Sequence, residues 1–275
     1  MSKRRAEASP SYEEALRKMR RRWLARQRNT CILPAHRGES KRIVIQRASE
    51  LGLLGDLSKK SKAAGALNKI RQALVQDLGQ KPVYFYGVRD KKHHASFSNF
   101  HKIELVVDRR EFVETIGRCL PHLDMEEFEE HKNCLVFHSS EQIFMLFKAL
   151  CMRDAVSAMD ILACQSATKA KALGRKVTPW DDELWNKLDV VCMVEALRIK
   201  FRNPPLRQVL LATGDRAIVE AAARDCKWGI GVGVSKAEGG ALWRGKNLLG
   251  EALCLVRQEF VEAEVLCSRK RRKIA

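Results

Sequence analysis

Glu141 and Lys148 lie seven residues apart in an otherwise strongly apolar segment. Their carboxylate and ammonium groups are therefore candidates for a catalytic role. In a helix, seven residues return the chain to within about 20° of the starting face, roughly 10 Å further along the axis. Ser139 or Ser140 is a suitable N-cap, which places Glu141 in the first turn, where the helix dipole favours negative charge. Because two charges on one face of a mostly buried helix are costly, the pair is either a structural ion pair or part of an active site.

Four polar segments outside the expected helices carry glycine or aromatic residues that suit a ligand: 97–100, 174–175, 228–231 and 245–250. Glycine lets backbone N–H groups approach an anion or a sugar, and an aromatic ring offers a flat face to a base. The glycines at 229–233 are not a dinucleotide fingerprint, because no strand precedes them with an acidic residue following at the right distance. No phosphate loop, HExxH or paired metal ligands occur, so the sequence predicts no metal or cofactor.

The elements that must position these groups are mainly helices. Aromatic and β-branched residues predict a short strand at 83–86 and a second at 103–107. Helical periodicity and capping residues predict helices at 154–162, 167–173, 182–201, 216–224 and 251–265, in addition to the helix of Glu141. The expected class is α+β, predominantly helical, with a small minor β element.

The charge divides the chain of 275 residues into three parts. Residues 1–80 carry 19 Lys/Arg against 7 Asp/Glu, and the tail 268–275 adds five more cations, so the net charge of +18 leaves 81–267 almost neutral. We expect 1–80 to be a basic helical extension, with Trp23 in an amphipathic helix at 11–28, and 81–267 to be the main domain. Basic flanks of this kind indicate DNA or RNA binding through 1–80 and 268–273, nuclear import, or solvated tails.

Composition also predicts where the protein works. There is no run of 18 apolar residues and no apolar leader at the N-terminus. The nine cysteines are scattered singly, a pattern typical of reduced, buried thiols. We therefore expect an intracellular protein, nuclear or cytoplasmic, without a membrane partner.

The order of short motifs between about Val83 and Gln258 resembles the NADAR family, the YbiA-like N-glycosidases. The matching motifs are Phe-Tyr-Gly (85–87), Phe-Ser-Asn-Phe (97–100), Ser139 with Glu141 and Lys148, Ala-Lys-Ala-Leu-Gly-Arg (170–175), Leu-Leu-Ala-Thr-Gly-Asp (210–215), Val-Glu (219–220), Trp-Gly-Ile-Gly (228–231) and Lys-Asn-Leu-Leu-Gly (246–250). Three features depart from the family pattern, one of which is that residues 1–80 and 268–275 have no counterpart in the minimal family domain. The residues after Glu141 read Gln-Ile-Phe-Met instead of the usual aromatic-rich run, and 106–133 resembles an insertion.

The resemblance implies a YbiA-like fold and cleavage of an N-glycosidic bond between a ribose and a base or amine. Glu141 would stabilise the oxocarbenium-like transition state and orient water. Lys148 would either anchor a phosphate or ribose hydroxyl, or attack the opened sugar aldehyde as an amine. For the ligand, the resemblance implies phosphate contacts from Arg175 and Lys246, sugar contacts from Ser98, Asn99, Asn247 and Asp215, backbone contacts at Gly229 and Gly231, and stacking by Phe97, Trp185 and Trp228.

Three functions remain open from the sequence. The first, which the basic flanks favour, is removal of ADP-ribose from guanine in nucleic acid. The second is hydrolysis of phosphoribosyl-amine intermediates of the riboflavin pathway. The third is a non-catalytic reader of ADP-ribose or a nucleotide, which the presence of both Glu141 and Lys148 argues against.

Overall fold

The computed structural model describes residues 72, 81–88, 94–120 and 134–274, with side chains as far as residue 268. In chain order the elements are β1 (Val83–Phe85), the 3-10 helix η1 (His94–Phe97), β2 (Leu105–Asp108), α4 (Arg109–Cys119), β3 (Cys134–Phe137), α5 (Ser140–Cys151), α6 (Ala155–Ala163), α7 (Ala167–Gly174), α8 (Asp182–Phe201), α9 (Pro204–Leu211), β4 (Ile218–Glu220), α10 (Val234–Glu238) and α11 (Leu248–Ile274). Helix predominates in the described residues, which confirms the predicted α+β, predominantly helical class. No helix in these residues is both long and apolar enough to span a bilayer.

The predicted appendages are only partly described. The helical extension expected at 1–80 lies outside the described residues, apart from Gln72. At the other end, α11 continues through the predicted basic tail as far as Ile274.

Polar N-caps explain where the central helices begin. Ser139 accepts a hydrogen bond of 3.2 Å from the N–H of Gln142, which confirms one of the two caps expected for the helix of Glu141. The same arrangement starts α6 to α9, whose caps are Asp154, Ser166, Asp181 and Asn203. The prediction of a helix at 182–201 is confirmed to the residue.

The strands form two separate pairs. β1 runs parallel to β4, with Val83 opposite Ile218 and Phe85 opposite Glu220, whereas β2 and β3 are antiparallel. The helix expected at 216–224 is therefore wrong. All three residues of β4 are buried between β1 and α11, and this long-range pairing overrides the local helical pattern.

The stretch predicted as an insertion, 106–133, contains the end of β2 and α4, while 121–133 lies outside the described residues. Phe112 of α4 stacks on Phe147 of α5, with 5.7 Å between ring centroids, and Ile116 is fully buried. The described part of this stretch is thus integral to the main core. Its status as an insertion remains a prediction.

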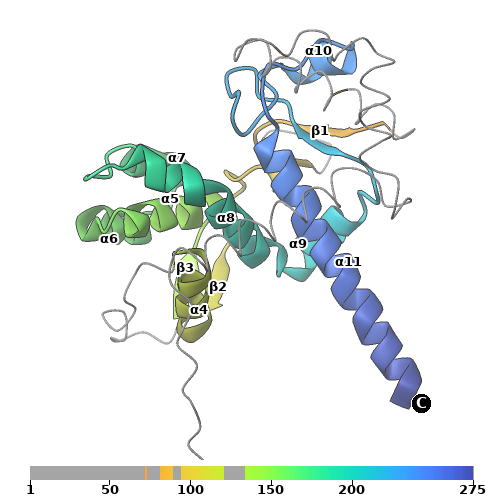
Figure 1. Cartoon of the computed structure of the whole chain (residues 1–275), viewed down its shortest axis with the longest axis horizontal. Coiled ribbons are helices and arrows are strands. Elements are labelled where there is room, and N and C mark those ends of the chain that lie inside the picture. Colours follow the sequence, from red (N-terminus) through yellow and green to blue (C-terminus); the bar gives the residue numbers. More distant parts are fainter. Residues whose placement is uncertain (1–71, 73–80, 89–93, 121–133, 275) are drawn as a thin grey trace, which may run out of the picture.

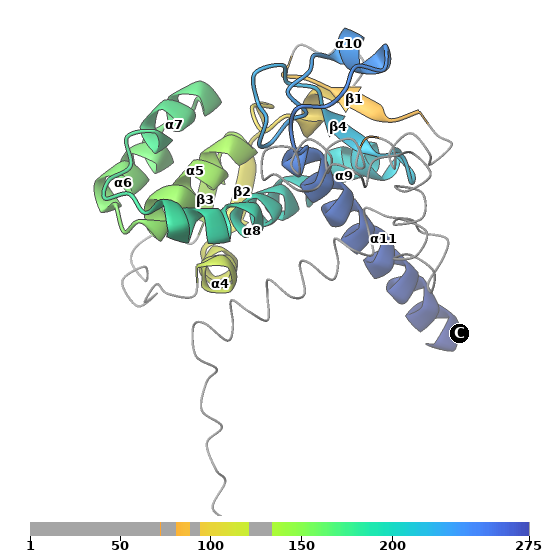
Figure 2. The same ribbon diagram turned by 45° about the horizontal axis from the view of Figure 1, so that its top comes forward.

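The molecule has two groups of elements on either side of α8. Figure 1 shows α5, α6 and α7 together on one side, with β1, α10 and the start of α11 on the other. The same separation is visible after the 45° turn of Figure 2. α8 packs against α5 in the first group and against α11 in the second, so segments far apart in the sequence face each other across one region.

Candidate active site

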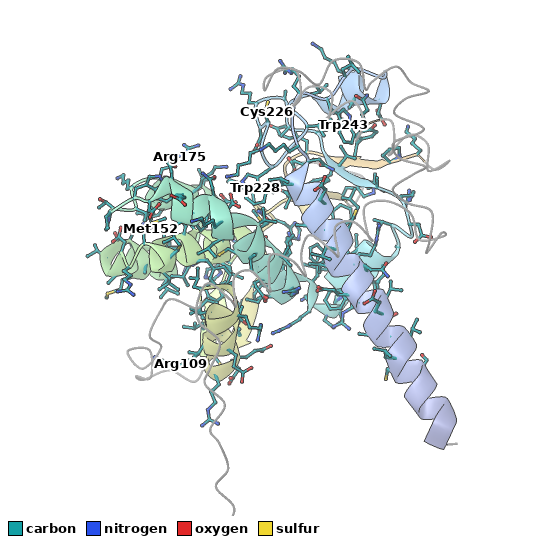
Figure 3. All side chains as sticks on the ribbon, in the orientation of Figure 1. Arg109, Met152, Arg175, Cys226, Trp228 and Trp243 are labelled. Atoms are coloured by element: carbon teal, nitrogen blue, oxygen red, sulfur yellow. The ribbon has the colours of Figure 1, made fainter. Side chains whose placement is uncertain are left out.

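A cavity of about 730 Å³ lies between these two groups of elements, a size typical of small-molecule sites. Figure 3 labels Arg175, on the α7 side, and Trp228, close to the start of α11. Seven of the predicted site residues line the cavity: Ser98, Asn99, Glu141, Lys148, Arg175, Trp185 and Trp228. The lining also contains groups that the sequence did not single out, among them Tyr86, Phe100, Lys171, Glu220, Arg224, Asp225 and Lys227.

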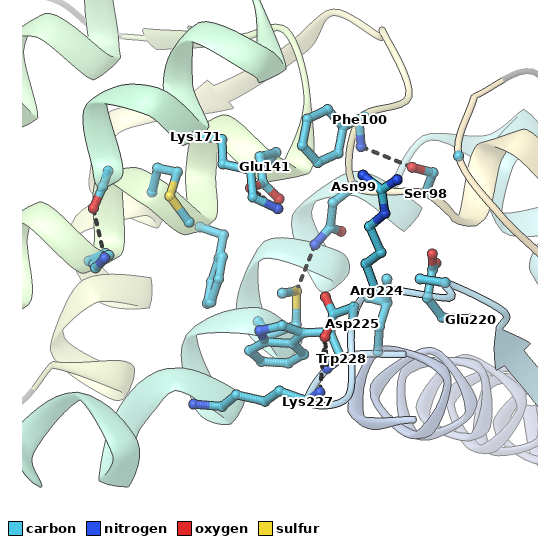
Figure 4. Close-up of a pocket in the computed structure, with 18 of the residues that line it drawn as sticks. Ser98, Asn99, Phe100, Glu141, Lys171, Glu220, Arg224, Asp225, Lys227 and Trp228 are labelled. Atoms are coloured by element: carbon cyan, nitrogen blue, oxygen red, sulfur yellow. Dashed lines mark hydrogen bonds and ion pairs between the residues drawn. The ribbon is translucent and has the colours of Figure 1, made fainter. Parts of the chain in front are cut away.

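Glu141 occupies the first turn of α5 and is only 4% exposed. Its N–H donates to the backbone oxygen of Asn99 at 3.0 Å, and the hydroxyl of the neighbouring Ser140 donates to Asn99 Oδ1 at 3.0 Å. The Nζ atom of Lys171 lies 3.8 Å from Glu141 Oε1. Figure 4 shows the two side chains next to each other. Burial raises the pKa of Glu141 to about 7, although Lys171 and the Asn99 side chain act in the opposite direction. The carboxyl group is therefore poised to gain or lose a proton near neutral pH.

Lys148 lines the same cavity, as its spacing from Glu141 predicted, but it is held by other partners. Its Nζ donates to the backbone oxygen of Gly174 at 2.7 Å and lies 4.2 Å from the ring centroid of Trp180. Gly174 permits this close approach of α7 to α5, because a Cβ at this position would meet the Met145 side chain. Burial, followed by the charge of Arg175, lowers the pKa of Lys148.

Lys171 is the lysine that the sequence analysis missed beside Glu141. It also lies 5.1 Å from the ring centroid of Phe100, so the ammonium group is bordered by a carboxylate and an aromatic face. Lys171 and Arg175 are four residues apart at the end of α7, and both line the cavity. That spacing was the sequence signal that would have identified Lys171.

Glu220, the last residue of β4, is a second buried carboxyl group in the cavity. Burial and the nearby Asp225 raise its pKa to about 8, against the opposing effect of Lys171 and Lys200. Lys200 is fully buried, and its Nζ donates to the backbone oxygen of Ser98 at 2.7 Å. Burial lowers the pKa of Lys200 to about 7. No role was predicted for either residue, although Glu220 belongs to the Val-Glu motif and Lys200 to the helix predicted at 182–201.

A turn after β4 forms the wall opposite α7. Asp225 Oδ1 accepts hydrogen bonds from the N–H groups of Lys227 at 2.9 Å and Trp228 at 2.8 Å. The Lys227 side chain forms an ion pair with the buried Asp189 and donates to Asn186 Oδ1 at 3.0 Å. The turn is therefore fixed both by its own backbone bonds and by α8.

Aromatic rings form one side of the cavity. Phe144 lies 5.3 Å from Trp185 and 5.3 Å from Trp228, the latter edge to face. Phe97, predicted to stack on the base, is instead fully buried in the core, 5.6 Å from the ring centroid of Phe85. It does not line the cavity.

The remaining predicted residues lie behind the cavity wall or away from it. Asn247 is buried, accepting a bond from the Glu220 N–H and donating to the Ile218 oxygen, both at 2.9 Å, so it holds β4 in place. Gly229 packs so closely that a Cβ would lie 2.9 Å from the Glu220 oxygen. Gly231 has a φ of +68°, which also favours glycine. Asp215 and Lys246 are exposed, and neither lines the cavity.

No cluster of His, Cys, Asp or Glu within the described residues is arranged to hold a metal ion. The cavity instead combines acids and bases with aromatic faces. Its carboxyl groups are Glu141, Glu220 and Asp225, and its cations are Lys148, Lys171, Arg175, Arg224 and Lys227. Such a lining suits a ligand that carries anionic groups and a flat base around a reacting bond.

The chain is similar to several known proteins. The sequence model of the NADAR domain matches residues 84–261. The chain is similar to N-glycosidase R617 of Acanthamoeba polyphaga mimivirus, at 38% identity over 141 residues, 50% of this chain and 79% of the viral protein. It is also similar to N-glycosidase Npun_R5314 of Nostoc punctiforme, at 34% identity over 44% of this chain and 72% of that protein.

Two further similarities are more distant. The riboflavin biosynthesis protein VVA0006 of Vibrio vulnificus is 28% identical over 66% of this chain and 40% of its own length. Among solved structures, the NMR structure of Escherichia coli YbiA is similar with a TM-score of 0.48 and 23% identity, covering 67% of this chain and 88% of YbiA.

Proposed function

The chain belongs to the NADAR domain family and is an N-glycosidase, and from this premise we propose that it hydrolyses the bond between ADP-ribose and a base, with guanine in nucleic acid as the substrate. The observation that carries the proposal is Glu141, which lines the cavity, is buried and has a pKa raised to about 7. The transition state of glycosidic cleavage resembles an oxocarbenium ion, which a carboxylate beside the anomeric carbon stabilises.

In this proposal Glu141 acts as the carboxylate that faces the anomeric carbon and orients the attacking water. Lys171, 3.8 Å away, keeps part of the carboxyl population ionised near pH 7, since a neighbouring cation lowers the pKa. Asn99 fixes the start of α5 and thereby the position of the Glu141 backbone. The edge-to-face pair Phe144 and Trp228, with Trp185, offers the apolar surface for the base.

Arg175 and Lys148 would bind the phosphates. The Arg175 side chain has no ion-pair or hydrogen-bond partner among the described residues, so its guanidinium is available for a bidentate phosphate contact. Lys148 is close enough to Arg175 for the two charges to interact. Because Gly174 and Trp180 already hold the Lys148 ammonium group, we assign it an anchoring role rather than attack on a sugar aldehyde.

The basic flanks fit a nucleic-acid substrate. Residues 1–80 and 268–273 carry nearly all of the net charge of +18, and such charge attracts polyanions independently of base sequence. We propose that they bring the cavity to DNA or RNA in the nucleus or cytoplasm. Deleting 1–80 should then weaken a salt-dependent affinity for DNA; an unchanged affinity would contradict this role.

The second candidate substrate is a phosphoribosyl-amine intermediate of riboflavin synthesis. The similarity to the riboflavin biosynthesis protein of Vibrio vulnificus favours this substrate. Both reactions cleave an N-glycosidic bond, so the same carboxylate would serve either substrate. The number of cations along the cavity favours the larger, more highly charged ADP-ribose.

The test incubates the protein with three substrates: ADP-ribosylated guanine in a DNA strand, free ADP-ribose conjugates, and the riboflavin-pathway intermediate. Released base and sugar are measured by chromatography and mass spectrometry. We expect release from the DNA conjugate, reduced about 10³-fold by Glu141→Gln, because removing a charge-stabilising group costs this order of rate. Equal turnover by Glu141→Gln would overturn the proposed mechanism. Release of sugar from the riboflavin intermediate alone would overturn the proposed substrate.

A further inference from the structure

The edge of the cavity nearest β1 and β4 contains two side chains that the mechanism above does not use, Tyr86 and Arg224. β1 and β4 are parallel, and the N–H of Ala221 donates to the Phe85 oxygen at 2.8 Å just where both strands end. Tyr86 follows β1 directly, and Arg224 lies four residues beyond β4. Both line the cavity, so the carboxyl ends of the two strands bring an aromatic ring and a guanidinium group to the same edge.

Both side chains face solvent without partners. Tyr86 is 60% exposed, a large value for an aromatic residue, and Arg224 is also exposed. Neither has an ion pair or side-chain hydrogen bond with any described residue. In Figure 4 the Arg224 side chain extends from the turn toward Ser98 and Asn99. An unpaired guanidinium and an exposed ring that line the same cavity are chemically suited to a phosphate with an adjoining base.

The other cations of the cavity are already engaged or lie elsewhere. Lys171 is paired with Glu141, and Lys227 with Asp189. Arg175 is the second unpaired guanidinium, but it lies at the end of α7, on the opposite wall. The cavity therefore offers two separate positions for anionic groups, one on each wall.

We propose that Tyr86 and Arg224 form a subsite for the nucleotide that flanks the modified guanine in a nucleic-acid strand. This inference rests on the proposed function and specifies the form of its substrate. Arg224 contacts the flanking phosphodiester, and the Tyr86 ring stacks on the flanking base, while Arg175 binds the ADP-ribose phosphates. A single strand is the form that fits, since its bases are free to stack on an aromatic side chain.

The test compares two substrates that share the same scissile bond. One is ADP-ribosylated guanosine without flanking nucleotides, and the other is the same modified base within a five-nucleotide single strand. In Arg224→Gln we expect KM for the strand to rise about tenfold, with kcat and the KM for the nucleoside conjugate within twofold of wild type. The salt dependence of the strand KM should also weaken, as expected when one phosphate contact is lost.

Matched variants separate charge from position. Lys236→Gln removes the same charge at an exposed position of α10 outside the cavity lining, and we expect wild-type KM for both substrates. Tyr86→Ala should raise KM for the strand about tenfold, and Tyr86→Phe should retain wild-type KM, because stacking does not need the hydroxyl. Equal effects of Arg224→Gln on both substrates, or none on either, would overturn the subsite while leaving the glycosidase proposal intact.

A failure of the proposed function would have a different signature. If wild type cleaves neither conjugate, the function fails, and the subsite is then decided by fluorescence anisotropy with an unmodified, labelled five-nucleotide strand. Weaker binding by Arg224→Gln than by Lys236→Gln would support the subsite. Identical binding by the two variants would overturn it.

Discussion

The two walls of the cavity differ in what fixes their charged groups. On α5 and α7, Glu141, Lys148 and Lys171 lie on helices whose caps and periodicity are local, and each has an internal partner. On the other wall, Glu220 and Arg224 depend on the pairing of β4 with a strand more than 130 residues earlier in the chain. From this difference we infer that residues of the helical wall catalyse the reaction and that residues of the wall after β4 select the substrate.

Replacing each of the two helical lysines gives the largest contrast within the first wall. We expect Lys171→Met to lower kcat about 100-fold, because Glu141 loses the cation that favours its ionised form. Lys148→Met should leave kcat within tenfold and instead lower the free energy of unfolding by about 1–2 kcal/mol, since the oxygen of Gly174 loses its charged donor. Steady-state kinetics and urea denaturation measure both effects. A larger loss of kcat in Lys148→Met than in Lys171→Met would mean that Lys148, and not Lys171, is the lysine that the reaction requires.

The pH dependence of the rate distinguishes the carboxyl groups of the two walls. Glu141 must be ionised to stabilise positive charge, and its pKa is raised to about 7, so kcat should increase roughly tenfold per pH unit below pH 7 and level off above it. In Lys171→Met the midpoint should move to higher pH, because the cation that lowers the Glu141 pKa is gone. Glu220→Gln should leave this midpoint in place if Glu220 only binds substrate. A midpoint that disappears in Glu220→Gln would assign the titration to the other wall.

The contrast between the walls also explains what the sequence predicted. The spacing of Glu141 and Lys148, the Ser139 cap and the bounds of α8 follow from local rules, and all were anticipated. β4 was predicted as a helix because its short apolar run is ambiguous without its partner strand. With β4 misassigned, Glu220 could not be placed in the cavity. Asn247 was expected to bind a sugar, but its amide instead satisfies the backbone of β4.

Stability should depend on pH through the same buried groups. The folded-state pKa values of Glu141 and Glu220 are raised, so their contribution is fully present below about pH 4.5 and is lost as pH rises through 7 to 8. The pKa of Lys200 is lowered to about 7, so its contribution increases again between pH 7 and 10.5. We expect the free energy of unfolding to fall by several kcal/mol from pH 5 to pH 8, because the loss from the two carboxyl groups exceeds the gain from Lys200. Urea denaturation of Glu141→Gln should show a shallower fall; an identical slope would mean that Glu141 is not the titrating group.

Asn247 tests whether the second wall depends on long-range support. Its side chain makes two hydrogen bonds to β4, at the Glu220 N–H and the Ile218 oxygen, and its φ is +57°. Asn247→Ala removes both bonds and replaces a residue type that tolerates the left-handed region with one that does not, so we expect a loss of about 2–3 kcal/mol in the free energy of unfolding. Asn247→Gly removes the same bonds without the backbone strain and should be about 1 kcal/mol less destabilising.

The matched change on the helical wall is Ser140→Ala, which removes the hydroxyl that donates to Asn99 Oδ1 at 3.0 Å and to the Asn99 backbone oxygen at 3.4 Å, and which leaves the Ser139 cap intact. We expect it to cost about 1 kcal/mol, less than either Asn247 variant, with KM near wild type. Asn247→Gly should raise KM, because Glu220 and the turn that carries Arg224 lose the support that fixes them relative to α11. If Ser140→Ala raised KM as much as Asn247→Gly, substrate binding would depend equally on the supporting hydrogen bonds of both walls. Substrate selection would then belong to the cavity as a whole and not to the wall built by β4.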